Sequence, residues 1–417
     1  MRQRRRLQRN VALVALGALV GAGSALAAPP TATAPVVYVR KDCTGIDDCI
    51  PDDDAIASDG LNQLHQYLYG TSGRWPSASD PVLVDIGAGT FKGGFVCASE
   101  QSGQLRRAGF VSYRGAGRER THIEGTVIAI SARTAMLAAD CEQIAFENLS
   151  MASDLAVYWL GGGRSNWTDV ELHGTQTAWY DTCPSATSPG NPLGEHFFWN
   201  SKLVGNEFAY LADCGLTWFY GSDLLLDYTV GTGSPTHEGA GIVIAHSGDV
   251  RAFGTSIRVV SDGIAAAPTG GFDGVRIGHA STGAGPAGDG VFHMHGGEIV
   301  VDSRALPGVD ATGVDVDDQN VGGASAHLNE TAIELLVAGT GTARRVFGTG
   351  THRSPFLWSP GTDPPFGGPG GTGLDSKTGQ DAFVDIGGSS PRLMIYDASC
   401  VGTGGPWWDT VGKACRP

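Results

Sequence analysis

The chain has 417 residues, 63 of them glycine, and a formal net charge of −15. An acidic protein lacks the basic surface with which proteins hold nucleic acid, and anionic membranes would repel it. We therefore expect neither nucleic acid nor a membrane as a partner, and a strongly anionic polysaccharide would require basic residues gathered locally.

The first thirty residues have the form of a secretory signal peptide. A basic segment precedes the apolar stretch Val11–Ala22, and Ala25-Leu26-Ala27 offers a small-x-small cleavage site. The apolar run is short for a membrane span. We expect residues 1–27 to be removed, which takes away five arginines and no acids and changes the charge from −15 to −20. The mature chain should then be secreted or periplasmic.

Eight cysteines follow the signal, and an even number in an exported chain favours disulfides. Proximity in the sequence suggests the pairs Cys43–Cys49, Cys97–Cys141, Cys183–Cys214 and Cys400–Cys415. Their spacing resembles no zinc site. We expect no metal and no cofactor.

Residues 28–81 are expected to form an N-terminal cap. It would begin with a strand at Val36–Val39 and contain the one convincing helix, Ile56–Tyr69, with Ser58 or Asp59 able to cap it. A cap covers the end strand of a repetitive sheet, which would otherwise template aggregation.

Residues 82–350 contain β-branched and aromatic segments between glycine-rich turns. The strand-like segments expected first are Val82–Ile86, Phe110–Tyr113, Thr126–Ile130, Gln143–Met151 and Leu155–Leu160. Beyond them one short pattern recurs: a small residue, then Ser, Thr or Gly, any residue, and an aliphatic one. The aliphatic members are Leu203, Leu224, Ile257, Ile299 and Ile333, and looser copies end at Leu149 and Val170. A constant motif with variable spacers predicts a solenoid.

The C-terminal part divides into two segments. Residues 351–381 are rich in proline and glycine and are expected to be a loop, and residues 382–417 are expected to form a cap closed by a disulfide. The predicted fold is therefore an all-β, right-handed parallel β-helix with an N-terminal helical cap and a disulfide-linked C-terminal cap. A β-sandwich would need regular hairpin signals, which are sparse.

Three segments resemble pectinesterases. Residues 85–125 contain DIGAGTFKGGF and YRGAGRERTHIEG, which are similar to the family's "GxYxE" and "GxGxxxTxIxG" turns. IAFENLSM at 144–151 and HFFWNSKLVGN at 196–206 are similar to its "ARNLTFxN" and "hYFxxCxIxG" strands. The resemblance covers about residues 82–226 and implies a pectin-lyase-like β-helix acting on a polysaccharide.

The family hydrolyses methyl esters of galacturonate with two aspartates, an arginine and a glutamine. Carried onto this chain, the resemblance implies Asp181 as acid/base, Glu207 as nucleophile or base, Gln176 as oxyanion donor and Arg251 orienting the carboxylates. The match is incomplete, because Thr177 follows Gln176 where the family has an acid, and Glu207 replaces the nucleophilic aspartate.

Other residues suit different chemistry. Asp315, Asp317 and Asp318 form an acidic cluster that suits calcium or paired-carboxylate glycoside hydrolysis, with a solvated loop as the simpler interpretation. His293 and His295 should project from one face of a strand, as metal ligands or as polar groove residues.

Aromatic residues complete the predicted site. Trp179, Trp199 and Tyr220 are candidates for stacking on sugar rings, with Trp179 expected to be exposed because its segment is polar. The chain is thus expected to be a monomeric polysaccharide-active protein, either a carbohydrate esterase of cell-wall glycans or a non-catalytic β-helix that binds glycan or stabilises the envelope.

Overall fold

The structure is a computed structural model. It describes residues 34–52, 59–70, 73–97, 99–101, 104–106, 109–125, 134–182, 194–213, 215–227, 239–245, 248–262, 271–277, 290–318, 325–329, 331–338, 342–350, 355–358, 380–381, 392–396, 407–409 and 414–416. The predicted signal peptide lies outside these ranges. Within them, no helix is both long and apolar enough to cross a membrane.

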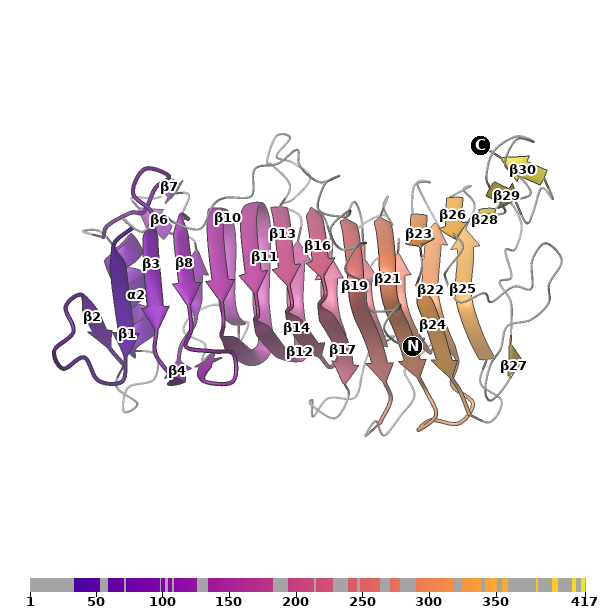
Figure 1. Ribbon diagram of the computed structural model, residues 1–417, viewed down its shortest axis with the longest axis horizontal. Coiled ribbons are helices and arrows are strands. Elements are labelled where there is room, and N and C mark those ends of the chain that lie inside the picture. Colours follow the sequence, from indigo (N-terminus) through magenta and orange to yellow (C-terminus); the bar gives the residue numbers. More distant parts are fainter. Residues whose placement is uncertain are drawn as a thin grey trace, which may run out of the picture.

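The strands follow one another in coils along a single long axis (Figure 1). Almost every pairing is parallel and joins residues of successive coils, so the strands fall into three ladders, which we call sheets 1, 2 and 3. The chain visits them in that order in each coil. This is the predicted parallel β-helix, whose crossovers take the right-handed form that such connections nearly always have.

Sheet 1 contains β2 (Cys49–Pro51), β1 (Val36–Arg40), β3 (Val82–Ile86), β8 (Val111–Arg114), the ends of β10 (Thr134–Glu147) and β11 (Ser150–Thr168), β13 (Gly194–Trp199), β16 (Leu216–Tyr220), the starts of β19 (Asp249–Val260) and β21 (Val291–Asp302), β23 (Ser325–Asn329), β26 (Pro355–Trp358) and β28 (Arg392–Tyr396).

Sheet 2 contains β4 (Gly89–Lys92), β9 (Thr121–Glu124), the starts of β11 and β12 (Glu171–Thr182), β14 (Lys202–Gly205), β17 (Asp223–Asp227), the ends of β19 and β21, and β24 (Ala332–Leu336). Sheet 3 contains β5 (Phe95–Cys97), the start of β10, the middle of β11, the end of β12, β15 (Phe208–Ala212), β18 (Gly239–Ile244), β20 (Phe272–Ile277), β22 (Ala311–Asp318), β25 (Thr342–Gly350) and β27 (Gln380–Asp381).

The repeated tetrapeptide of the sequence is the corner between sheet 1 and sheet 2. Its first residue has a left-handed backbone, with φ of 48° at Asn200, 56° at Gly221 and 57° at Gly254. Glycine and asparagine adopt this conformation more readily than other residues, which explains the small residue of the motif. The aliphatic residues lie in register on sheet 2, in the order Leu203, Leu224, Ile257, Ile299 and Ile333.

The second residue of the motif supplies a buried hydroxyl that joins neighbouring coils. The Ser201 Oγ atom lies 3.1 Å from the carbonyl oxygens of both Trp167 and Trp199, and it accepts a hydrogen bond from the Val170 amide at 3.3 Å. Equivalent hydroxyls on the following coils belong to Ser222 and Thr255. At this corner the Val170 amide turns away from the regular ladder, and the Ser201 hydroxyl gives this buried donor its partner.

The looser copies of the motif occupy a different register from the one expected. The left-handed residue of these coils is Asn148 or Asp169, so Leu149 and Val170 take the place of the hydroxyl residue. The residue in register with Leu203 is Leu172, two positions after Val170. The expected strand Gln143–Met151 is accordingly broken by this corner into β10 and β11.

The interior is a continuous column of buried side chains along the axis. Aromatic rings stack from coil to coil within it: the Phe146 and Trp167 centroids lie 4.3 Å apart, and those of Phe198 and Phe219 lie 4.8 Å apart. Parallel register places like residues at the strand spacing of about 4.8 Å, which is close to the separation of stacked rings.

The N-terminal end is capped by helix α2 (Asp59–Tyr69), which packs Leu61, Leu64 and Leu68 on the core. The amide of Gly60 in its first turn donates to the Asp52 carboxylate at 3.1 Å. The predicted disulfides Cys43–Cys49 and Cys97–Cys141 are confirmed. Each of the other two predicted pairs includes at least one cysteine outside the described residues.

The C-terminal end differs from the expected plan in one respect. Strand β26 lies inside the segment expected to be a loop and pairs with β23 and β28, so sheet 1 continues beyond residue 350. Its four residues are mostly apolar, but they lie in a segment rich in proline and glycine, a composition that indicates a loop. After β28 the pairing becomes antiparallel through β29 (Trp407–Asp409) and β30 (Ala414–Arg416).

Near the N-terminal end, a short antiparallel hairpin of β6 (Ser99–Gln101) and β7 (Gln104–Arg106) forms a separate two-stranded sheet.

Candidate functional site

The outer face of sheet 1 carries a ladder of four stacked rings, one from each of β13, β16, β19 and β21. Trp199 and Tyr220 have ring centroids 4.0 Å apart, Tyr220 and Phe253 5.1 Å, and Phe253 and His295 5.2 Å. The interplanar angles are 8°, 9° and 7°. Each inner ring is therefore covered on both faces by its neighbours and presents only its edge outward.

A second column runs beside this ladder on the same strands. Phe197 and Trp218 stack at 4.5 Å and 2°, and a guanidinium covers each end of the pair. The Arg164 guanidinium carbon lies 4.7 Å from the Phe197 centroid, and that of Arg251 lies 5.7 Å from the Trp218 centroid. Cations are attracted to ring faces, so these contacts hold both arginines against the aromatic column.

Arg251 is also fixed by a carboxylate on its own strand. Its Nη2 atom donates to Asp249 Oδ2 at 2.6 Å and its Nε atom to Oδ1 at 3.1 Å. Such a two-point pair is geometrically specific, and the hydrogen bonds from Arg251 to Asp249 raise the pKa of the guanidinium. The side chains remain 41% and 18% exposed, so both groups can still contact a ligand.

Two histidines continue the second column. The rings of His293 and His327 stack at 4.4 Å, and His293 lies in register with Arg251. Burial, together with a contribution from the neighbouring His327, lowers the pKa of His293 to about 4, and Asp249 opposes the shift. Burial also lowers the pKa of His327. Both imidazoles are therefore uncharged at neutral pH and can accept a proton.

The structure brings three of the predicted site residues onto this one face: Trp199, Tyr220 and Arg251. Gln176 and Glu207 meet elsewhere, at the corner where the chain enters sheet 3. There the Glu207 amide donates to the Gln176 carbonyl at 2.7 Å. The predicted catalytic set is thus divided between two faces of the helix.

Asp181, the predicted acid/base, lies inside the helix and is 1% exposed. Burial raises its pKa well above 3.8, and the nearby Asp213 carboxylate adds to the shift. Its Oδ2 atom is 3.7 Å from Nε2 of His196, whose Nδ1 is 2.8 Å from Ser165 Oγ. Burial lowers the pKa of His196 to about 3, so the imidazole is neutral. In this arrangement no substrate could reach Asp181.

The expectation that Trp179 is exposed was wrong, because its side chain is fully buried. It packs against Trp167 at 5.2 Å, edge to face, and against Trp159 at 5.9 Å. The polar neighbours Thr175 and Gln176 are exposed at the corner, and the strand that follows turns Trp179 inward. Trp179 belongs to the core and cannot stack on a sugar.

Of the acidic cluster expected on β22, the structure describes the side chain of Asp315. Asp315 approaches Arg276 at 3.9 Å, and Arg276 also pairs with Asp273. These charges lie on the outer side of sheet 3, where Asp273 and Arg276 are almost inaccessible to solvent. Across the described ranges, no group of three or more metal-ligating side chains is arranged to hold an ion.

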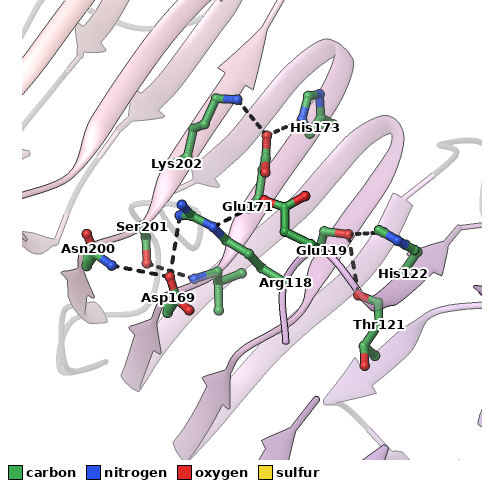
Figure 2. A network of polar contacts seen from close by, with 12 residues as sticks. Arg118, Glu119, Thr121, His122, Asp169, Glu171, His173, Asn200, Ser201 and Lys202 are labelled. Atoms are coloured by element: carbon green, nitrogen blue, oxygen red, sulfur yellow. Dashed lines mark hydrogen bonds and ion pairs between the residues drawn. The ribbon is translucent and has the colours of Figure 1, made fainter. Parts of the chain in front are cut away.

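The outer side of sheet 2 carries a polar network (Figure 2). Glu171 binds both the Lys202 ammonium and His173 at 2.7 Å, and hydrogen bonds from His173 and Lys202 lower its pKa to about 2. At the neighbouring corner, Asp169 contacts Arg118 at 3.4 Å and accepts a hydrogen bond from the side-chain Nδ2 atom of Asn200 at 3.2 Å. The bonds of Lys202 to Glu171, Arg118 to Asp169 and Asn200 to Asp169 cross from one coil to another, which gives the network a stabilising role.

Sequence reasoning gave no role to Asp249, Phe253 or His327. The alternation Asp249-x-Arg251-x-Phe253 could have shown that Asp249, Arg251 and Phe253 share a strand face. It could not have shown which residues of other coils lie beside them, because the coils differ in length.

No protein-family model and no curated protein matches the chain. Among solved structures, pectin methylesterase PemA from Erwinia chrysanthemi aligns with 75% of this chain and 89% of its own, at 13% identity and a TM-score of 0.40. A mutant pectin methylesterase in complex with a hexasaccharide covers the same shares at 9% identity and 0.35. The fold assignment rests on the strand pairing and not on these scores.

Proposed function

We propose that the protein is an exported polysaccharide-binding protein whose binding face is the outer side of sheet 1 from β13 to β23. The observation that carries this proposal is the continuous column of aromatic, arginine and histidine side chains on that face. Tryptophan, tyrosine and arginine are also the residues that most often dominate binding energy at protein surfaces.

A polymer suits this face because its groups recur once per coil. Successive coils present equivalent positions about 4.8 Å apart along the axis. A glycan lying along the axis would meet an aromatic edge and a polar group at each step. Asp249 and Arg251 supply acceptor and donor groups for hydroxyls, and Arg164 adds a second guanidinium on the same face.

Affinity electrophoresis against a panel of neutral and acidic cell-wall polysaccharides tests the proposal. We expect Trp218→Ala and Arg251→Gln to weaken binding to whichever glycan retards the wild type. Arg304→Gln is the matched control, because Arg304 forms the same two-point pair with Asp302, at 2.6 Å and 2.9 Å, away from sheet 1. Equal weakening by Arg304→Gln, or no retardation of the wild type by any glycan, would refute it.

Hydrolysis of a carbohydrate ester is the second candidate, and the meeting of Asp249, Arg251 and His293 favours it. Water would attack the ester carbonyl carbon while the neutral His293 imidazole takes its proton. Arg251 would stabilise the oxyanion, and the departing alkoxide would recover the proton from the imidazolium, leaving an acid and an alcohol. Asp249 would hold Arg251 in place.

Alcohol release from a methyl-esterified polysaccharide distinguishes the two candidates. We expect an esterase on sheet 1 to lose activity in Asp249→Asn and His293→Gln and to retain it in Asp302→Asn. Loss in Glu207→Gln instead would support the set implied by the family resemblance. A wild type that binds glycan without releasing alcohol would leave the binding function alone.

The export proposed above rests on the N-terminal sequence pattern. N-terminal sequencing of the protein recovered from the medium or periplasm should find a chain beginning near Ala28. A chain that keeps residues 1–27 in the cytoplasm would contradict it.

A further inference from the structure

The outer face of sheet 1 changes character between β11 and β13. On the β13 side the ladder begins with Trp199, and its register partner on β11 is Thr168. The position before that, on β10, is Glu147. The ring stack therefore ends at Trp199, next to a side chain too small to cover an indole.

Trp199 differs in this respect from the rings that follow it. Tyr220 lies between Trp199 and Phe253, and Phe253 lies between Tyr220 and His295, so both faces of each are covered. In the adjacent column, the corresponding end ring, Phe197, is covered by the Arg164 guanidinium. Among the residues that the structure describes, Trp199 has a ring on one face only, and its side chain is half-buried beside the exposed Thr168.

The outward-facing residues beside Trp199 on β11 are polar. Thr168 supplies a hydroxyl, and Asn166 occupies the neighbouring outward position on β11. Glu195 on β13 contacts Arg164 at 3.8 Å across the same pair of strands. An aromatic face beside hydroxyl and amide groups suits a ligand with one apolar face and a rim of hydroxyls.

We propose that the open face of Trp199 is a stacking platform for one pyranose ring of the glycan, with the sugar lying over Thr168. The axial C–H bonds of a pyranose give it the apolar face that stacks on an indole, and its ring hydroxyls meet Thr168 and Asn166. The inference rests on the proposed glycan-binding function and adds where along the face a sugar ring stacks. The edges of Tyr220 and Phe253 offer no such surface.

Two substitutions remove the platform in different ways. Thr168→Leu covers the open face with an aliphatic side chain, and Trp199→Leu removes the ring. Thr168→Val leaves the indole open and removes only the hydroxyl, so it should weaken binding less than Thr168→Leu does. Tyr158→Leu is the control, because Tyr158 stacks on Tyr180 at 5.4 Å in a pair on the outer side of sheet 3.

The measurement is the dissociation constant for the glycan that binds the wild-type full chain best, with thermal unfolding to confirm that each variant is folded. We expect Thr168→Leu and Trp199→Leu to weaken binding about 10-fold, the loss of about 1.4 kcal/mol. Tyr158→Leu should stay within about twofold, a change of under about 0.5 kcal/mol.

If Thr168→Leu binds the glycan as tightly as the wild type does, the stacking platform is refuted, whereas the proposed binding function is not. Weakening of the same size in Tyr158→Leu would also overturn it, because the effect would then not belong to this step. A wild type that binds no glycan would overturn the proposed function and the platform together.

Discussion

The buried carboxyl of Asp181 makes a sharp prediction about the pH dependence of stability. Burial and the repulsion from Asp213 raise its pKa well above 3.8, so the folded protein keeps a proton that the unfolded chain releases. The stability contributed by this group is complete below pH 3.8 and is lost as the pH rises through the folded pKa. Replacing the carboxyl by the uncharged amide of Asp181→Asn removes that loss.

The neighbouring His196 acts in the opposite sense. Its pKa falls from 6.5 to about 3, so the folded protein gives up a proton that the unfolded chain holds. Its contribution is complete above pH 6.5 and is lost as the pH falls toward 3. Each group changes the free energy of unfolding by about 1.4 kcal/mol per pH unit, with opposite signs, so in the wild type the two slopes cancel from about pH 4 up to the folded pKa of Asp181.

The Asp181→Asn variant should expose the histidine slope. We expect its free energy of unfolding, relative to the wild type, to rise by about 1.4 kcal/mol per pH unit from about pH 4 up to the folded pKa of Asp181. Urea unfolding of the full chain, followed by tryptophan fluorescence at steps of pH, measures this difference. Effects of the other carboxyls cancel in the subtraction.

Asp302→Asn is the matched control. Hydrogen bonds from Arg304 lower the pKa of Asp302, so its removal should change the pH dependence in the opposite direction. The effect should be small because Asp302 is partly exposed. A difference between Asp181→Asn and the wild type that is constant with pH, or that shrinks as the pH rises, would refute the reasoning for Asp181.

Three further predictions concern the joints between coils. Ser201→Ala leaves the buried Val170 amide without its hydrogen bond and should lower the free energy of unfolding by about 1–3 kcal/mol in urea titration. Ser201→Thr keeps the hydroxyl and should retain most of that stability. Equal loss in both variants would contradict the role of the hydroxyl. Replacing Cys97 and Cys141 by serine opens a loop of 44 residues and should lower the free energy of unfolding by about 4 kcal/mol. The comparison is with the wild type unfolded with and without reductant. A wild type that reductant does not destabilise would contradict a stabilising role of this disulfide. Glu171, whose pKa is lowered from 4.5 to about 2, contributes stability above pH 4.5 that is lost as the pH falls toward 2. In Glu171→Gln this acid loss should shrink by less than about 1 kcal/mol because solvent screens the partly exposed pair, and an unchanged acid limb would show that the ion pair is not stabilising.

The fold could be predicted because its corner has a strict chemical requirement. A left-handed residue followed by a hydroxyl leaves a mark in the sequence wherever it occurs, as at Asn200-Ser201 and Gly221-Ser222. The earlier corners at Asn148 and Asp169 lack the hydroxyl, so the pattern was placed two residues out of register. The strand inside the proline-rich segment was missed because four residues are too few for an alternation to stand out.

The candidate site was harder to predict, because it depends on register between coils of unequal length. Phe253 and Tyr220 stack although 33 residues separate them, while Trp199 and Tyr220 are 21 apart. Single-strand reasoning also failed for Trp179, since its polar neighbours lie at a corner and the strand beyond it faces inward. The family resemblance carried residues to positions in the sequence, whereas the fold distributes Gln176 and Arg251 over different faces.

The left-handed corner between sheets 1 and 2 also makes the molecule divisible into units. Variation in coil length must be accommodated at the other two corners, because this corner keeps the same geometry from Asn148 to Gly254. Asn200 and Gly221 hold equivalent places on successive coils, so residues 200–220 constitute one complete turn of the helix. Joining Trp199 directly to Gly221 would remove that turn without changing the path of the chain on either side. A protein of this kind can therefore be shortened or lengthened by whole turns, and with it the length of any polymer that it spans.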